Sequence, residues 1–484
     1  MVILGSLTIG VLIILVFELT IRWRGHHEAQ RLVRLIHERA EQPERENPYL
    51  LRPREVTAQR SGRIAMVAPF GLCRKMTVRS RMVPMAVSLR ERGYDVTIFV
   101  PPWDCPKGSS LDKSIDSLRL VHVRRAKWMP RVYDALLFAR LLRQVMAFQP
   151  DIVYGFKPIG YSGAVSLLAY ILKEVPWIRS KIGLRKVLVD ADDWEGFGGW
   201  ADRIEGTYLA KFVRDRQERL SLRYCDAVTV VSEELENRAK ALRKGGNSVF
   251  YVPNGLRADL WPEAPPRQAI PSELDERLRR LGNPKVLLLY TRFAEFKAER
   301  LITILAKVLE AIPNTALLIV GTSFDRESRL QRLKLLPLAD QAGIDRERIV
   351  TVGWVRYRGL PKYWSATRVA IYPCDDTCIN RAKSATKILE LMAAGKAIVA
   401  DNVGEIGRAI ELGKCGLLVP PGDSDAFSQA VVRLLRDEQL QIRLGEAANK
   451  TAHTEFEWSR IVSTVERAIE SDRESLPVTK LING

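Results

Sequence analysis

Basic and hydroxyl side chains gather between residues 383 and 387, just ahead of an acidic residue. Lys383, Ser384, Thr386 and Lys387 stand at the start of a predicted helix, and Glu390 lies one turn further in. Free amides at a helix start can bind an anion beside lysine ammonium groups, and a carboxylate can accept hydrogen bonds from sugar hydroxyls. This pattern favours a nucleotide sugar, although an ordinary capped helix with a solvated Lys/Glu face would look the same.

The elements around this segment follow from its apolar pattern. An apolar run at 369–372 predicts a strand, and apolar residues at helical spacing over 388–392 predict a helix that Gly395 ends. A second buried run begins at residue 397, so the unit is strand, helix, strand. Its first loop then lies at the carboxyl ends of parallel strands, where such sheets bind ligands.

A second basic pair follows the first strand predicted in this half of the chain, at 286–290. Arg292 and Lys297 lie five residues apart in the loop that leads into the next helix. This spacing lets both charges converge on one diphosphate. Two solvated basic residues at a helix start remain the alternative.

Acidic and aromatic residues follow a buried strand predicted at 187–189. Asp192 and Asp193 are candidate catalytic residues, because a carboxylate at a strand's carboxyl end can orient an acceptor hydroxyl or take its proton. Glu195 and Trp194 are candidate acceptor-binding residues, the indole offering an apolar wall. Loop carboxylates that only cap the next helix are the alternative.

Two further loops carry basic candidates. Lys157 follows the strand at 152–154 and could stabilise charge there, although a buried lysine paired with a carboxylate for structural reasons is equally consistent. Arg74 and Lys75 follow the first strand and could bind the phosphates of a lipid-linked acceptor. Gly71, beside them, is a candidate donor-binding residue.

Length and composition bound the function. A chain of 484 residues predicts two or three domains, and a net charge of +18 predicts an anionic partner. Six scattered cysteines and only five histidines indicate a reducing compartment without a structural metal. No recognition motif accompanies the positive charge, so nucleic acid fits less well than a membrane surface or a phosphorylated substrate.

The amino-terminal segment predicts a membrane anchor. Residues 1–21 contain one ionised residue, Glu18, and would form about 30 Å of apolar helix. A cleaved signal peptide is the alternative. Arginines gather in the juxtamembrane basic segment, 22–61, and none precedes the apolar run. The positive-inside rule therefore predicts a single-pass cell-membrane protein with cytoplasmic catalytic domains.

The remaining chain alternates strands and helices, which predicts the α/β class. We expect a Rossmann-like acceptor domain at 62–265, a proline-rich linker at 266–283 and a Rossmann-like donor domain at 284–452, both doubly wound and facing a cleft. A helix at 453–472 is predicted to pack back across the domains, followed by a tail at 473–484.

Several motifs together resemble one known family. They are Arg292-x4-Lys297, Ile319-Val-Gly321, Val352-Gly-Trp354, Lys387-Ile-Leu-Glu390-Leu-Met-Ala-Ala-Gly395, Val403-Gly-Glu405 and Gly416-Leu-Leu-Val-Pro-Pro-Gly422. Their order and spacing are similar to those of GT-B glycosyltransferases of the family-4 type, over about residues 62–472.

The resemblance implies a function and a set of roles. Arg292 and Lys297 would hold the donor diphosphate, Glu390 the ribose, and Gly321 would let the backbone approach the nucleotide. It further implies sugar transfer with retention from a nucleotide-sugar donor. Together with the predicted membrane anchor and its basic flank, this predicts a glycan or lipid-linked acceptor at the inner leaflet. No cofactor or metal is implied.

Two positions depart from the family pattern. Ala382 stands where the first of two signature glutamates is usual, although a subgroup with a lysine-rich loop exists. The loop after the strand at 152–154 carries Lys157 where a histidine is common. A non-catalytic scaffold of the same fold, or a nucleotide-sugar epimerase or phosphorylase, is therefore the alternative function.

Overall fold

The computed structural model describes residues 62–71, 77–101, 114–123, 134–243, 248–257, 260–263, 268–323, 325–384 and 386–471. Across those ranges, no helix has both the length and the apolar character needed to cross a membrane. The predicted anchor at 1–21, the juxtamembrane segment at 22–61 and the tail at 473–484 lie outside the described residues, as do Arg74 and Lys75.

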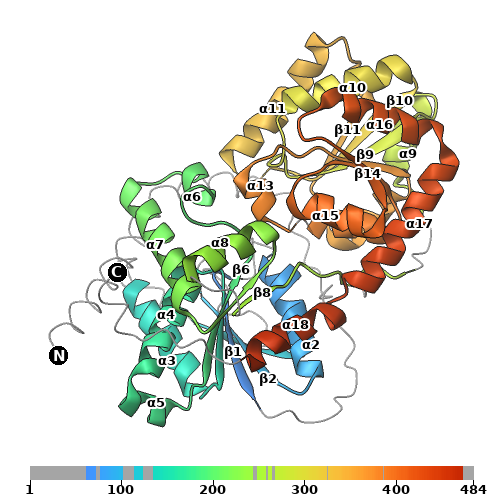
Figure 1. Cartoon of the computed structure of the whole chain (residues 1–484). Coiled ribbons are helices and arrows are strands. Elements are labelled where there is room, and N and C mark those ends of the chain that lie inside the picture. The colour runs from blue at the N-terminus through green and yellow to red at the C-terminus, as the bar shows by residue number, and fades with distance from the viewer. Residues whose placement is uncertain are drawn as a thin grey trace. The chain divides into compact units, whose positions relative to one another are not determined.

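The chain folds into two compact units. The N-terminal unit comprises residues up to Val252 together with those from Val462 onward, and the C-terminal unit runs from Pro253 to Ile461. Each contains one sheet with helices packed against it (Figure 1). This confirms the prediction of two Rossmann-like α/β domains.

The N-terminal unit is built around an eight-stranded sheet of order β3-β4-β2-β1-β5-β6-β7-β8, parallel except for β3. Its strands are β1 (Arg63–Val67), β2 (Asp95–Val100), β3 (Ser114–Ile115), β4 (Leu118–His122), β5 (Ile152–Phe156), β6 (Lys186–Ala191), β7 (Ala227–Val230) and β8 (Val249–Tyr251). Its helices are the π-helical turn η1 (Val78–Met82), α2 (Val83–Glu91), α3 (Asp134–Ala147), α4 (Gly160–Glu174), α5 (Pro176–Ile182), α6 (Trp200–Arg203), α7 (Tyr208–Tyr224) and α8 (Glu233–Arg243).

The C-terminal unit is built around a parallel sheet of order β11-β10-β9-β12-β13-β14. Its strands are β9 (Lys285–Tyr290), β10 (Thr315–Val320), β11 (Ile349–Gly353), β12 (Val369–Tyr372), β13 (Ala397–Asp401) and β14 (Gly416–Val419). Its helices are α9 (Ser272–Arg280), α10 (Ala298–Ala311), α11 (Arg326–Gln341), η4 (Arg346–Arg348), η5 (Tyr357–Gly359), α12 (Leu360–Trp364), α13 (Cys378–Ala382), α14 (Thr386–Ala393), α15 (Gly404–Gly413), α16 (Ser424–Arg436) and α17 (Glu438–Glu455).

Alternation along the buried strands produces two cores in the C-terminal unit. On β9, Leu287 and Leu289 join one core, and Leu288 between them joins the other. Helices α10, α11 and α16 cover the first face, α14 and α15 cover the second, and α17 contributes to both cores (Figure 1). Burial on both faces explains why these strands read as continuous apolar runs.

The unit boundary differs from the predicted linker at 266–283. Leu256 and Trp261 pack into the C-terminal core, so the chain joins that unit from Pro253. Helix α9 occupies 272–280 and buries Leu274 and Leu278, which share one helix face four residues apart. In the sequence, the prolines around this segment indicate a linker more strongly than these two leucines indicate a helix.

The last helix, α18 (Trp458–Glu470), returns to the N-terminal unit. There Glu466 pairs with Arg92, which follows α2 (Figure 1). Lys186 Nζ at the start of β6 donates to the Ile469 carbonyl at 3.1 Å. The described residues of α18 from Val462 onward thus belong to the same compact unit as β1 to β8.

A buried ion pair joins η1 to β6 in the N-terminal unit. Arg81 Nε and Nη2 donate to the Asp190 carboxylate at 2.8 and 2.6 Å, and Thr229 Oγ1 donates to Asp190 Oδ1 at 2.6 Å. Burial would lower the pKa of Arg81, but Asp190 raises it above its usual value. The Asp190 carboxylate therefore has a structural role, as the partner of Arg81 and Thr229.

Replacing Asp190 with alanine should strongly destabilise the N-terminal unit, because Arg81 would be left as an uncompensated buried charge. We expect the free energy of unfolding in urea to fall by about 3–5 kcal/mol. In the control Glu236→Ala, which removes only the partly exposed pair with Lys240, the change should stay below about 1 kcal/mol. Equal losses in the two variants would contradict the assignment.

Candidate functional site

Polar residues collect where the strand order of the C-terminal sheet reverses. β9 and β12 are parallel neighbours there, and their following elements run to opposite sides. Ligands bind at such a switch point, beyond the carboxyl ends of the strands. The loop after β9 carries Arg292 and Lys297, and the loop after β12 leads to Lys383 and Lys387.

Glu295, which the sequence reasoning missed, is the centre of this site. Its carboxylate is buried, with Oε1 at 3.4 Å from Lys383 Nζ and 3.7 Å from Lys387 Nζ. Burial alone would raise the pKa of Glu295, but Lys383, Lys387 and Arg292 hold it well below its usual range. These four residues are called the basic cluster. A lone acid between two basic residues, in a strand-to-helix loop, was the available signal.

The two members of the predicted Arg/Lys pair act on different carboxylates. Arg292 acts on the pKa of Glu295 and belongs to the basic cluster. Lys297 is exposed at the start of α10, and its charge acts instead on Asp375. Arg292 thus shares the acidic partner Glu295 with the lysines of the second loop, and convergence of Arg292 and Lys297 on one diphosphate stays a prediction.

Lys387 lies in the first turn of α14, with Nζ 5.6 Å from the centre of the Tyr290 ring. Burial lowers its pKa to about 8, and Arg292 and Lys383 act in the same direction against the opposing effect of Glu295. An anion bound here would relieve this repulsion among cations. Ser384 and Thr386, on either side of the helix start, hydrogen-bond to Asn254.

Glu390 is buried one turn further along α14. Tyr357, a residue absent from the sequence prediction, donates its hydroxyl hydrogen to Glu390 Oε1 and itself accepts from Trp261 Nε1 at 2.9 Å. Glu390 Oε2 is buried without a hydrogen-bond partner. Burial raises the pKa of Glu390 to about 7, against hydrogen bonding and the charge of Lys387. Tyr357 thus holds one carboxylate oxygen, and the Tyr290 hydroxyl also acts on the carboxylate and lowers its pKa.

Gly321 ends β10 with a φ of +128°. A Cβ atom there would lie 1.9 Å from the Thr291 carbonyl oxygen. The glycine therefore allows the end of β10 to approach the loop after β9. The predicted approach of the backbone to a nucleotide stays a prediction. Ala382 is buried at the end of α13, so the buried carboxylate at this site comes from Glu295.

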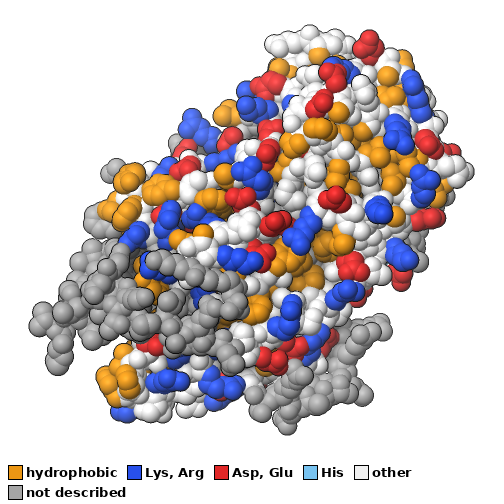
Figure 2. Space-filling view, in the orientation of Figure 1, with side chains coloured by type: hydrophobic (Ala, Val, Ile, Leu, Met, Phe, Trp, Pro, Cys, Tyr) orange, Lys and Arg blue, Asp and Glu red, His pale blue; other side chains and the backbone are white. Residues whose placement is uncertain are grey.

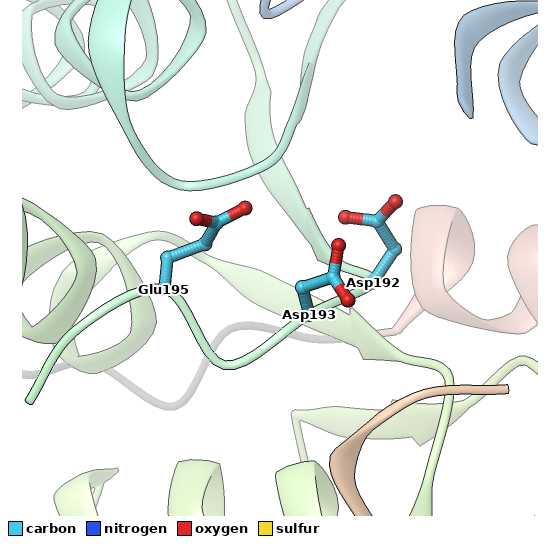
Figure 3. Close-up of side chains that lie close together, drawn as sticks. All are labelled: Asp192, Asp193 and Glu195. Carbon is cyan, nitrogen blue, oxygen red and sulfur yellow. The ribbon is translucent and has the colours of Figure 1, made fainter. Parts of the chain in front are cut away.

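A second charged group lies in the N-terminal unit, where β5 and β6 end. Lys157 is buried with a φ of +60°, and its Nζ lies 3.0 Å from Asp192 Oδ1, 2.5 Å from Asp193 Oδ2 and 2.8 Å from Glu195 Oε1. Figure 3 shows the carboxylates of Asp192 and Glu195 turned toward the same space. These four residues are called the carboxylate cluster.

The carboxylates in this cluster differ in proton affinity. Burial raises the pKa of Asp192 to about 7, with Lys157 opposing and the neighbouring carboxylates adding to the shift. Burial would also raise the pKa of Glu195, but Arg214 and Lys157 hold it well below its usual range. Asp192 is therefore the member that can exchange a proton near neutral pH.

Asp192, Asp193 and Glu195 each offer an oxygen within 4.8 Å of one another, as a metal site would require. The Lys157 ammonium group already contacts all three carboxylates. A cation of the protein's own thus supplies the charge that a metal ion would bring.

Trp194, predicted to bind the acceptor, has structural partners in its own unit. Trp194 Nε1 donates to the Phe197 carbonyl at 2.8 Å, and the Arg238 guanidinium lies 4.0 Å from the centre of the Trp194 ring. The ring also lies against Gly198 and Gly199, so it braces its own loop. Gly71 is buried just after β1.

Two family models match the chain. The model described as "Glycosyl transferase 4-like domain" matches residues 77–255, and "Glycosyl transferases group 1" matches residues 284–437. Together they span more than half of the sequence. The chain belongs to the GT-B glycosyltransferases of the family-4 type.

Relatives with known names agree with this membership. The glycosyltransferase is 26% identical over 431 residues to a phosphatidyl-myo-inositol mannosyltransferase from Mycobacterium leprae, covering 84% of this chain and 96% of the relative. It resembles sucrose-phosphate synthase from Thermosynechococcus elongatus with a TM-score of 0.59 at 20% identity, covering 84% of this chain and 98% of the other. It also resembles Anabaena Alr3699/HepE in complex with UDP and glucose, with a TM-score of 0.60 at 16% identity, covering 85% and 100%. At these identities the two structures show the fold alone.

Replacing Lys157 with methionine should destabilise this glycosyltransferase more at pH 8 than at pH 5. Without the ammonium group, the clustered carboxylates repel one another when ionised, so their native-state pKa values rise above those of the unfolded chain. The native state then binds more protons, and stability falls as pH rises. Urea unfolding at both pH values measures this difference, with Lys240→Met on the surface as the control. A loss that did not depend on pH would contradict this account.

Proposed function

We propose that this glycosyltransferase moves a sugar, with retention, from a nucleotide-sugar donor to a lipid-linked acceptor at the inner face of the cell membrane. The observation that carries the proposal is the basic cluster. Three cationic side chains surround one buried carboxylate at the sheet's switch point, which leaves a positive surplus suited to a diphosphate.

On the donor side, each charged group has a chemical task. When the bond between the sugar's anomeric carbon and the phosphate oxygen breaks, the nucleoside diphosphate keeps the electron pair. Arg292, Lys383 and Lys387 stabilise that developing charge. The Glu390 carboxylate, one turn into α14 from Lys387, accepts a hydrogen bond from a ribose hydroxyl.

On the acceptor side, the carboxylate cluster supplies the proton acceptor. Asp192 has a pKa of about 7, so its carboxylate can take the proton of the acceptor hydroxyl as that oxygen attacks the anomeric carbon from the face that the diphosphate leaves, as retention requires. Lys157 holds Asp192 and Asp193 in place and balances their charge. We therefore propose that turnover needs no metal ion.

An exposed aromatic patch supports an acceptor with an apolar part. It comprises Phe197, Tyr208, Leu209 and Phe212, with Tyr208 74% and Phe212 41% exposed. The Tyr208 ring stacks on both phenylalanines, at 5.7 and 6.5 Å between ring centres. Figure 2 shows hydrophobic and basic side chains side by side over this part of α7. The loop of Phe197 continues directly from the carboxylate cluster.

The apolar segment at 1–21 and the net charge of +18 support placement at an anionic membrane surface. We propose a single amino-terminal span with both units in the cytoplasm. The Mycobacterium leprae relative, a phosphatidyl-myo-inositol mannosyltransferase, makes phosphatidylinositol the first acceptor to test. Deleting residues 1–21 should release the protein from the membrane fraction, and retention there without them would refute the anchor.

Turnover is tested by nucleotide release from UDP- and GDP-sugars, comparing wild type with Lys387→Ala and Glu390→Ala. Each variant loses a contact that involves a charged group, so kcat/KM should fall about 10- to 100-fold. Lys307→Ala, which removes an exposed pair with Asp425, is the matched control and should retain wild-type turnover. Wild-type rates in both site variants would remove the assignment.

The same assay tests the finer points. Activity should persist in EDTA, and loss of activity that Mg²⁺ or Mn²⁺ restores would refute metal independence. Proton NMR of the first-formed product should show the donor's anomeric configuration, whereas the opposite anomer would refute retention.

The aromatic patch is tested with phosphatidylinositol vesicles as acceptor. Exchanging Tyr208 and Phe212 for serine should raise the apparent KM for vesicle-borne acceptor several-fold, because apolar surface that contacts lipid is lost. The matched control exchanges Leu330 and Leu333, exposed on α11, for serine. Equal effects of the two double variants would argue against a specific role for the patch.

A non-catalytic scaffold is the second candidate. It is favoured by Ala382, which is buried where the family usually places a signature glutamate. Calorimetric titration distinguishes the candidates, since a scaffold would show no affinity for nucleoside diphosphates or sugar nucleotides.

A further inference from the structure

The sequence Pro253-Asn254-Gly255 has no role in the chemistry described so far. It begins the segment Pro253–Leu256, here called the crossover turn, at which the chain enters the C-terminal unit. Within that unit, Asn254 makes three hydrogen bonds to the residues at the start of α14. Its backbone N–H donates to Ser384 Oγ at 3.2 Å, and its Nδ2 donates to the Ser384 carbonyl at 2.8 Å and to Thr386 Oγ1 at 3.1 Å.

These bonds have a direction that matters for an anion. Asn254 is the donor in all three, so the hydroxyl oxygens of Ser384 and Thr386 act as acceptors. A hydroxyl that accepts one hydrogen bond still has its own hydrogen to donate. Both hydroxyls can therefore donate to a phosphate oxygen beside Lys383 and Lys387, which flank them in sequence.

The other end of the crossover turn is bound to the start of α18. The Leu256 N–H donates to the Phe456 carbonyl at 2.5 Å. A Cβ atom on Gly255 would lie 2.6 Å from the Trp458 ring, so the turn packs directly on that indole. A few residues later, between Ile461 and Val462, the chain returns to the N-terminal unit.

We propose that Asn254 is a positioning residue for the donor diphosphate, and that the crossover turn couples occupancy of the site to both chain crossings between the units. Asn254 aims the two hydroxyls and fixes the start of α14, and the same turn is held against 456–458. A diphosphate bound by Ser384 and Thr386 holds these residues in place. Through Asn254 it also restrains the two segments, 253–257 and 456–461, at which the chain passes between the units. This inference rests on the proposed function, because it takes a nucleoside diphosphate as the ligand.

A matched control exists at the opposite end of the same helix. Asn449 Nδ2 donates to the Ala393 carbonyl at 2.7 Å, where α14 ends. Asn449→Ala removes one asparagine contact to α14 without touching either hydroxyl. This variant shows how the affinity for a diphosphate changes when α14 is loosened without a change at either hydroxyl.

The test measures affinity of full-length protein in detergent for UDP and GDP by calorimetry, with thermal unfolding recorded for each variant. Asn254→Ala should weaken the Kd about tenfold, because it removes the side-chain bond that orients the Thr386 hydroxyl and the bond that holds the Ser384 carbonyl. Asn254→Asp should weaken it at least as much, since a carboxylate cannot donate and repels the diphosphate. Asn449→Ala should bind as wild type does even if its melting temperature falls.

Hydrogen exchange tests the coupling. In wild type, saturating diphosphate should slow amide exchange in 386–393 and also in 253–257 and 456–461. In Asn254→Ala at saturation, protection of 386–393 should remain and protection of the two crossings should be lost.

Each other outcome overturns something definite. If wild type binds and Asn254→Ala binds within twofold of it, or if Asn449→Ala weakens binding equally, the positioning role is wrong. Diphosphate protection confined to 386–393 in wild type overturns the coupling. A wild type that binds neither UDP nor GDP overturns the proposed function, and this inference with it.

Discussion

Charge balance around the buried carboxylate of Glu295 is the constraint on which the C-terminal site depends. Lysine side chains avoid one another in a low-dielectric interior unless an opposite charge lies among them. Glu295 supplies that charge to Lys383 and Lys387, and Arg292 adds to the positive side. Its backbone carbonyl also accepts from the Asp375 N–H at 2.8 Å and from Asn380 Nδ2 at 2.9 Å. One residue thus neutralises the cluster in part and joins the loops that carry it, and the remaining positive charge suits a ligand with more than one negative charge.

The N-terminal unit has the opposite arrangement, in which one buried cation balances several carboxylates. Asp192, Asp193 and Glu195 would repel one another, and Lys157 lies among them. Both groups stand at carboxyl ends of strands beside the switch point of their sheet, after β5 and β6 in one unit and after β9 and β12 in the other. This is where parallel sheets leave loops open to ligands. In each unit the sheet determines where charged side chains can lie exposed. The buried residue of opposite charge determines how much net charge remains there.

Sequence patterns were sufficient wherever structure is set by near neighbours. The alternation of buried strands and helices predicted both sheets, and the loops predicted to carry chemistry do follow β5, β6, β9 and β12. Patterns failed where a distant partner decides. No residue near Asp190 in the sequence indicates its partner, Arg81, which lies 109 residues away. The predicted linker contains α9, because two leucines packed against a distant core outweigh the prolines on either side.

The sequence by itself determined the fold class, the family resemblance and the loops in which charged residues gather, because these depend on periodicity and spacing within a few residues. Only the tertiary structure decided which charges meet. It paired Lys383 with Glu295 across 88 residues, set Tyr357 against Glu390 across 33, and joined Asn254 to Ser384 across 130. Such pairs form because folding brings polar groups into a dry interior, where each must find a partner of opposite charge or a hydrogen-bond complement. No local pattern encodes that choice.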